Sequence, residues 1–257
     1  MTDEPDVAAP ALVRHLAPSD ITRCLTLGLR DFLAAPLFGL FFALVYVAGG
    51  WLIVWAVTAK GQLWWTLPAA AGFPILGPFI ACGLYEVSRR REAAQALDWP
   101  GVLGVILHQR NRQIPFLAAI VVVFFLFWNF LAHMIFALFL GLSTMTNITS
   151  SFAVFLTPDG MLMLAFGTLV GAGFAGVLFA LTAVSLPMLL DREVDAVTAM
   201  ITSVSVVLSN PVTMGLWGLI IAVLLFAGMV PWFLGLFVVL PVLGHASWHL
   251  YRCALAP

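Results

Sequence analysis

The stretch from Pro36 to Thr58 reads PLFGLFFALVYVAGGWLIVWAVT and contains no Asp, Glu, Lys or Arg. The hydrocarbon core of a bilayer is about 30 Å thick, and a helix needs about 20 apolar residues to cross it. An apolar run without alternation favours a helix over a strand of a membrane barrel. The stretch therefore predicts a transmembrane helix.

Five further apolar stretches of comparable length follow this one. Hydrophobic residues make up 63% of the chain and charged residues 9%, whereas a soluble domain is about 45 to 50% apolar. A soluble fold is excluded, and we expect an all-α membrane protein with six transmembrane helices. The five further spans are predicted at Trp64 to Val87, Pro115 to Leu140, Met161 to Leu190, Pro211 to Val230 and Pro231 to Leu250.

Positive charge predicts the orientation of these spans, because Lys and Arg near span ends remain on the cytoplasmic side. Lys60 alone falls on one side of the six spans. All the arginines fall on the other side: Arg14, Arg23, Arg30, Arg89, Arg90, Arg91, Arg110, Arg112, Arg192 and Arg252. We therefore expect a protein of the bacterial inner (plasma) membrane with both termini in the cytoplasm.

An internal repeat organises the chain. Prolines begin every second span, at Pro36, Pro115 and Pro211, and about 15 residues of helical apolar periodicity precede each of them. Ser19 or Asp20 is expected to cap the first of these short helices, and the third is expected to begin near Asp195. We predict three same-orientation repeats, each an interfacial amphipathic helix followed by a two-helix hairpin. Their bounds are about 18–92, 98–194 and 195–254, within a single domain of residues 18–257 that follows a disordered cytoplasmic tail at residues 1–17.

Arg89, Arg90 and Arg91 form the largest basic cluster, at the inner end of the second span. The formal net charge of the chain is −1, which argues against nucleic acid as a partner. We interpret the cluster as a topology anchor, with contact to anionic lipid headgroups as a second interpretation. Membrane lipids are thus the first expected partners.

Two polar residues, Asn129 and His133, lie one helical turn apart deep in the third span. Side chains at this spacing share a helix face, and they either form a ligand or cofactor corner or hydrogen-bond a neighbouring helix. His245 and His249 share a face at the inner end of the last span, where the spacing suits two ligands of a metal or haem. Interfacial histidines without a ligand are the alternative, and no third ligand accompanies them.

Other chemistry is missing from the sequence. It contains no phosphate-binding glycine loop with a lysine, no GxSxG, no HExxH and no CxxC. Cys24, Cys82 and Cys253 map to the cytoplasmic half, where thiols stay reduced, and are expected to be packing residues. The middle of each span lacks charges, which lowers the case for an ion-coupled transporter. We therefore predict no catalytic residues and no cofactor.

Three stretches carry a resemblance to a known family: LGLRDFLAAPLFGLFFALVYVAGG, FPILGPFIACGLYEVSRRRE and VVLPVLGHASWHLYR. Their order of short helix, proline and two spans, the second ending in arginine, resembles a family of uncharacterised bacterial six-span integral membrane proteins. Some members are labelled as similar to cytochrome c oxidase subunit I. The resemblance implies no established activity, and this chain lacks the intramembrane histidines of a haem-copper core.

Three hypotheses about function follow. The first is a non-catalytic accessory, assembly or scaffold protein of a membrane complex, with a respiratory complex as one such partner. The second is a passive channel or small-solute transporter, in which Gly171, Asn129 and His133 line a cavity. The third is a haem-binding or metal-binding oxidoreductase component that uses His133, or the pair His245 and His249.

Overall fold

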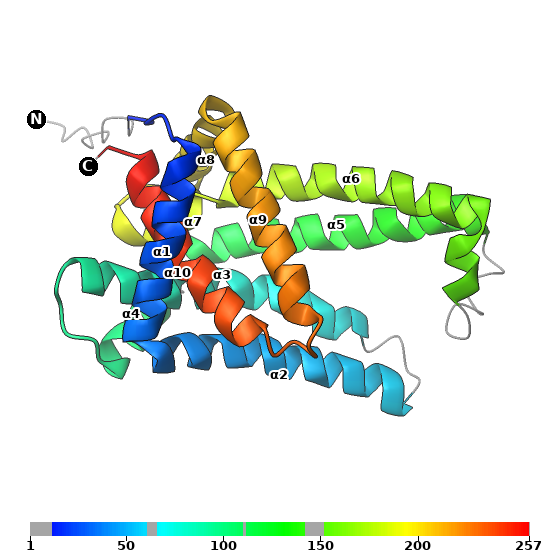
Figure 1. The fold of residues 1–257 in the computed structure, drawn as a ribbon, viewed down its shortest axis with the longest axis horizontal. Coiled ribbons are helices and arrows are strands. Elements are labelled where there is room, and N and C mark those ends of the chain that lie inside the picture. Colours follow the sequence, from blue (N-terminus) through cyan, green and yellow to red (C-terminus); the bar gives the residue numbers. More distant parts are fainter. Residues whose placement is uncertain (1–11, 61–65, 110–111, 142–151, 257) are drawn as a thin grey trace, which may run out of the picture.

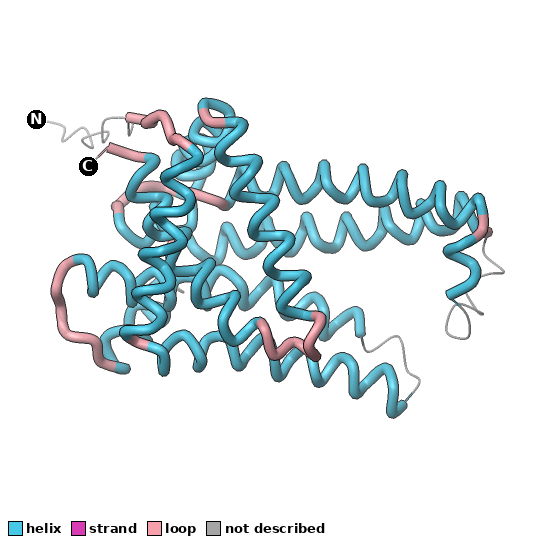
Figure 2. Tube along the Cα trace, viewed as in Figure 1, coloured by secondary structure: helices cyan, strands magenta, loops and turns pink. Residues whose placement is uncertain are grey.

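The computed structural model describes residues 12–60, 66–109, 112–141 and 152–256, and most of them are helical (Figures 1 and 2). Within these ranges there is no strand, so the expected all-α fold is confirmed. The elements are α1 (Pro18–Ala34), α2 (Pro36–Lys60), α3 (Thr66–Glu92), α4 (Trp99–Gln109), α5 (Ile114–Leu140), the 3₁₀ helix η3 (Phe152–Leu156), α6 (Pro158–Thr182), α7 (Ser185–Asp191), α8 (Ala196–Ser209), α9 (Pro211–Met229) and α10 (Leu236–Ala254).

Four segments of the described chain are long and apolar enough to cross a membrane: Pro36–Trp55, Ile114–Leu140, Pro158–Asp191 and Pro211–Met229. The remaining two expected spans, the count of six and the threefold repeat stay predictions. Lys60 and Arg110, which entered the charge argument, have side chains outside the described part.

Prolines separate the short helices from the long ones. Ala35 lies between α1 and α2 with φ of −137° and ψ of 55°, outside the helical region that a following proline disfavours. Pro36 and Pro211 then occupy the first helical position, where the missing N–H costs nothing. The short helices α1, α4 and α8 therefore precede the long helices α2, α5 and α9 as separate elements.

Helix boundaries differ from the sequence prediction at two notable places. The predicted span Met161 to Leu190 is divided into α6 and α7. The last helix starts at Leu236 and not at Pro231, because Trp232 and Phe233 adopt left-handed backbone with φ of 52° and 65°.

The start of one short helix was predicted correctly and the cap of another wrongly. The helix α8 begins next to Asp195 as expected, and the Asp195 side chain caps it by accepting a hydrogen bond from the Thr198 N–H. At α1 the cap position is Ala17, so neither Ser19 nor Asp20 occupies it. The Asp20 carboxylate instead accepts the Ala17 N–H at 2.8 Å, which satisfies a donor at the start of the helix.

The first and last described residues meet at one end of the molecule, where α1 packs along α10 (Figure 1). Val13 and Leu255 form an antiparallel backbone bridge, and the Ala256 N–H donates to the Leu12 carbonyl at 3.0 Å. The Leu16 N–H donates to the buried Asn210 side chain at the start of α9. Residues 12–16 of the expected tail are therefore held by hydrogen bonds, while residues 1–11 lie outside the described part.

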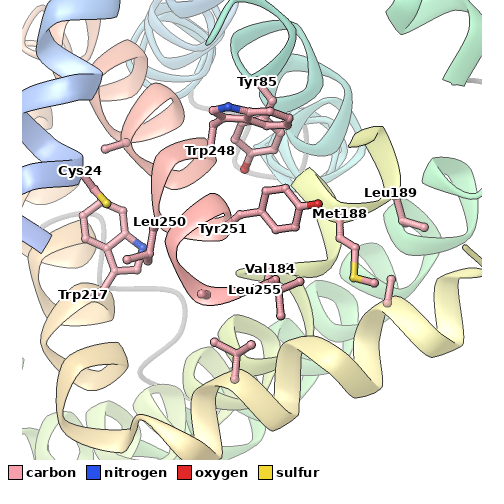
Figure 3. Packing of buried hydrophobic residues seen from close by; sticks show 14 of the residues in the cluster. Cys24, Tyr85, Val184, Met188, Leu189, Trp217, Trp248, Leu250, Tyr251 and Leu255 are labelled. Carbon is pink, nitrogen blue, oxygen red and sulfur yellow. The ribbon is translucent and has the colours of Figure 1, made fainter. Parts of the chain in front are cut away.

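The main core lies at this same end. Trp217 of α9 and Trp248 and Tyr251 of α10 are fully buried and converge there (Figure 3). Gly28 lets α1 approach α10 closely, because a Cβ atom at this position would lie 2.6 Å from the Ala246 backbone nitrogen. The apolar face of α1 is thus covered by protein.

The α5–α6 hairpin runs away from this core (Figure 1). In the most apolar part of Ile114–Leu140 and of Pro158–Asp191, only 17% is buried inside the chain. The corresponding share for Pro36–Trp55 is 33%. Large side chains such as Phe130, Leu138 and Leu169 are exposed along the hairpin. Hydrocarbon or another protein must cover this surface, because water would not tolerate an apolar area of this extent.

Candidate functional site: a polar junction between the ends of the chain

A polar cluster lies where α1, the end of α3 and α10 meet. Its centre is Asp31 of α1, whose side chain is buried among the helices. The Asp31 Oδ1 atom accepts from the Arg91 Nε at 2.8 Å, and Oδ2 lies 2.8 Å from the His249 Nε2. We use the name polar junction for Asp31, Ser88, Arg91, His245 and His249.

The carboxylate of Asp31 is held in its charged form. Burial raises its pKa, but hydrogen bonds from His249, Arg91 and Ser88 have the larger combined effect and lower the pKa to about 2. The carboxylate is therefore ionised throughout the physiological range. It acts as an acceptor that joins the first and last helices of the described chain to the end of α3.

Ser88 and His245 form the second half of the polar junction. The Ser88 Oγ lies 2.8 Å from the His245 Nδ1, and both side chains are fully buried. The His245 Nε2 has no hydrogen-bond partner among the described residues. A serine beside a histidine is a pair used in nucleophilic catalysis, but burial denies this pair contact with a substrate.

The predicted anchor arginines are all paired with carboxylates. Glu86, whose side chain is fully buried, accepts from the Arg89 Nε at 2.7 Å and from the Arg90 Nε at 2.6 Å. Arg90 also reaches Asp98 at 3.0 Å, and Arg91 binds Asp31. These contacts fix the three side chains within the fold, and their roles as topology or lipid anchors stay predictions.

A second set of polar contacts ties α10 to α3 and α7. The Trp248 Nε1 donates to Glu92 at 2.9 Å, and the Tyr251 hydroxyl donates to the Asp191 carboxylate at 2.7 Å. Burial and the hydrogen bond to Asp191 raise the pKa of Tyr251, so its hydroxyl remains protonated. Arg252 lies between the two acids, at 3.2 Å from Glu92 and 3.3 Å from Asp191.

Asn129 and His133 bond to their own helix. The Asn129 Nδ2 donates to the Phe125 carbonyl, and the His133 Nδ1 lies 2.7 Å from the Asn129 carbonyl. The His133 side chain is exposed on the outside of α5, and the space beside Gly171 is occupied by the Trp128 ring, 2.8 Å from a Cβ atom placed there. The polar atoms of Asn129 and His133 are thus used within α5 and the space at Gly171 is filled, and the role of these three residues in ligand binding stays a prediction.

His245 and His249 share one side of α10 but have different partners. The His245 Nδ1 faces Ser88, whereas the His249 Nε2 faces Asp31. In the described part of the chain, His, Cys, Asp and Glu form no group of three or more that could hold a metal ion. Metal or haem binding by the two histidines stays a prediction.

Sequence reasoning missed Asp31, Ser88 and Glu86 as partners. One signal was present for Asp31, which lies three residues beyond Gly28 and so continues the apolar stripe of α1. A carboxylate on an otherwise apolar stripe indicates a buried partner. Ser88 gave no comparable signal, because its partner is 157 residues away in the sequence.

The membrane-length helices and their exposed apolar faces define an integral membrane protein. Residues 66–191, from α3 through α7, match the model of a family described as "Predicted integral membrane protein (DUF2189)". The resemblance to a family of uncharacterised integral membrane proteins is thereby confirmed. No curated protein matches the chain, and no solved structure does.

Proposed function

We propose that the protein is a non-catalytic accessory, assembly or scaffold component of a membrane protein complex. The observation behind this proposal is that one end of the molecule is polar and internally bonded, whereas the α5–α6 hairpin is apolar and exposed. Polar groups gather at the end where the chain termini meet, and they bond to one another. The long α5 and α6 helices leave most of their apolar surface to be covered from outside the chain.

The polar junction supports an architectural role. Each oxygen of the Asp31 carboxylate is used by a group from another helix, Arg91 of α3 or His249 of α10. Groups locked into such contacts orient helices, whereas a catalytic group must reach a substrate. The polar junction thus supports a role as a scaffold that holds the exposed helices α5 and α6 in place.

The surface of α8 supports contact with the membrane face. Its small or polar residues Ala199 and Ser203 are buried against the protein, while Val197, Ile201 and Leu208 are exposed. A helix with one apolar side turned away from its own protein is suited to the headgroup and acyl-chain boundary. We place α8 at the cytoplasmic face of the inner membrane, with both termini in the cytoplasm.

Gentle-detergent purification of a tagged full-length chain tests the proposal. We expect a membrane protein complex in stoichiometric amount in the eluate. A photo-crosslinking amino acid at Leu169, which is exposed on α6, should then attach to a protein of that complex. The same probe at Met163, which is buried on α6, is the matched control and should not.

Other outcomes separate the alternatives. A monomer that co-purifies with no protein, and that crosslinks only to lipid from Leu169, contradicts a role in a complex. A Soret band in the purified sample would favour the haem hypothesis. Solute flux through proteoliposomes that is reduced by His133→Leu would favour a channel. Reporter fusions at residues 60 and 150 should be active outside the cytoplasm, and cytoplasmic activity there would overturn the proposed orientation.

A further inference from the structure

Two of the three cysteines of the chain meet at the contact between α1 and α10. The Sγ atoms of Cys24 and Cys253 lie 4.0 Å apart, although the residues are 229 positions apart in the sequence. A disulfide requires a sulfur–sulfur distance of about 2.05 Å. Formation of the bond therefore requires the two side chains to rotate about their Cα–Cβ bonds.

The two thiols have different environments. Cys24 is fully buried against α10, whereas Cys253 is half-buried beside the C-terminal residues. The Cys24 thiol donates a hydrogen bond to the Cys253 sulfur, and this bond, with the nearby positive charge of Arg23, lowers the pKa of Cys253. The same bond and burial raise the pKa of Cys24. A thiolate therefore forms more readily on Cys253, the more accessible sulfur, than on Cys24.

We propose that Cys24 and Cys253 are a reversible thiol modification site, in which an oxidant converts them to a disulfide that locks α1 to α10. Reactive cysteines are accessible thiolates with a resolving cysteine nearby, and this pair has both properties. Disulfides of cytoplasmic thiols are transient and often redox-sensing. The inference rests on the proposed function only for the cytoplasmic placement of the two thiols.

The oxidant is a peroxide. The Cys253 thiolate attacks one peroxide oxygen, the O–O bond breaks, and Cys253 becomes a sulfenic acid while hydroxide leaves and is protonated to water. The Cys24 sulfur then attacks the Cys253 sulfur. An S–S bond forms, and the S–O bond breaks, so that the second oxygen leaves as water with the proton of Cys24. Two thiols lose two electrons in total, and one hydrogen peroxide becomes two waters.

Thiol counting on the purified full-length chain tests the proposal. The reduced protein is treated with hydrogen peroxide, quenched, denatured and labelled with a polyethylene glycol maleimide that adds one mass step per free thiol. We expect three steps before oxidation and one afterwards, because Cys82 is buried in α3 and has no partner cysteine. Dithiothreitol should restore three steps.

Peptide mapping without reductant identifies the bond. A linked pair of peptides that contain Cys24 and Cys253 supports the proposal, and it needs no variant that must fold. Three free thiols after treatment with a tenfold excess of peroxide would overturn it. A bond between two Cys253 peptides would also overturn it, since that product requires only a surface thiol.

Single variants separate the roles of the two sulfurs. In Cys24→Ser the sulfenic acid at Cys253 has no resolving thiol, so dimedone should capture it. In Cys253→Ser the two remaining thiols should react with peroxide at least about tenfold more slowly than Cys253 of the natural chain. Equal rates for Cys24 and Cys253 would contradict the assignment of Cys253 as the attacking sulfur.

Discussion

The His249 Nε2 lies 2.8 Å from the Asp31 Oδ2, and this contact joins the last helix of the chain to the first across 218 residues of sequence. Arg91 binds the other oxygen of the same carboxylate from α3. One side chain therefore holds three helices in register. Its replacement should therefore destabilise the packing of α1, α3 and α10 together.

Asp31→Asn should lower the free energy of unfolding by about 1 to 3 kcal/mol, because hydrogen bonds to a charged group are lost and the Arg91 cation is left without its partner. Thermal unfolding in detergent, followed by circular dichroism, measures the effect. Asp159→Asn is the matched control, since Asp159 is exposed in the first turn of α6. Equal losses in the two variants would contradict a role for Asp31 in stability.

The contribution of Asp31 should depend on pH. Its pKa is lowered from 3.8 to about 2, so the stability it adds is fully present above about pH 4 and is lost as the pH falls towards 2. The difference in melting temperature between the natural chain and Asp31→Asn should therefore stay constant from pH 7 to pH 5. Below pH 4 it should shrink, and a difference that grows on acidification would contradict the sign of the shift.

Ser88→Ala should lower the free energy of unfolding by about 1 to 3 kcal/mol, because the His245 Nδ1 loses its buried partner. Ser247→Ala, on the same helix as His245, is the control. The Ser247 hydroxyl bonds only to the Leu243 carbonyl of its own helix, so its loss should cost less than about 0.5 kcal/mol. Chemical denaturation of both variants in the same detergent compares them directly.

Gly28→Ala and Gly104→Ala should have opposite effects. A Cβ atom at residue 28 would lie 2.7 Å from the Val242 carbonyl oxygen, so α1 must move away from α10 at a cost of about 1 to 3 kcal/mol. A Cβ atom at residue 104 meets nothing within 4 Å, and alanine there should stabilise α4 by up to about 1 kcal/mol. A melting temperature that does not fall in Gly28→Ala would show that α1 and α10 are not tightly packed.

Much of the helical framework was predictable because it depends on local chemistry. Pro36 and Pro211 begin helices as expected, and Asp195 caps α8, since proline geometry and side-chain capping act over a few residues. The break between α6 and α7 was not predicted. The Val184 N–H in that break donates to the buried Ser203 of α8, a partner that periodicity does not reveal.

For the same reason, only the histidines of the candidate site were predicted from the sequence, and their partners were not. The spacing of His245 and His249 correctly placed both on one side of a helix, because 3.6 residues per turn fixes that relation. Their partners Ser88 and Asp31 come from other helices, and only the packing of α1, α3 and α10 brings them close. The sequence therefore indicated where polar groups lie on one helix but not what they bind.

The bridge between Val13 and Leu255 can form only after nearly the whole chain has been synthesised. When α1 leaves the ribosome, the helix that will cover its inner face has not yet been made. The contacts of Asp31 with His249 and of Cys24 with Cys253 cannot form until the final turns of α10 are translated. A nascent chain truncated before α10 therefore leaves the apolar face of α1 without the helix that covers it.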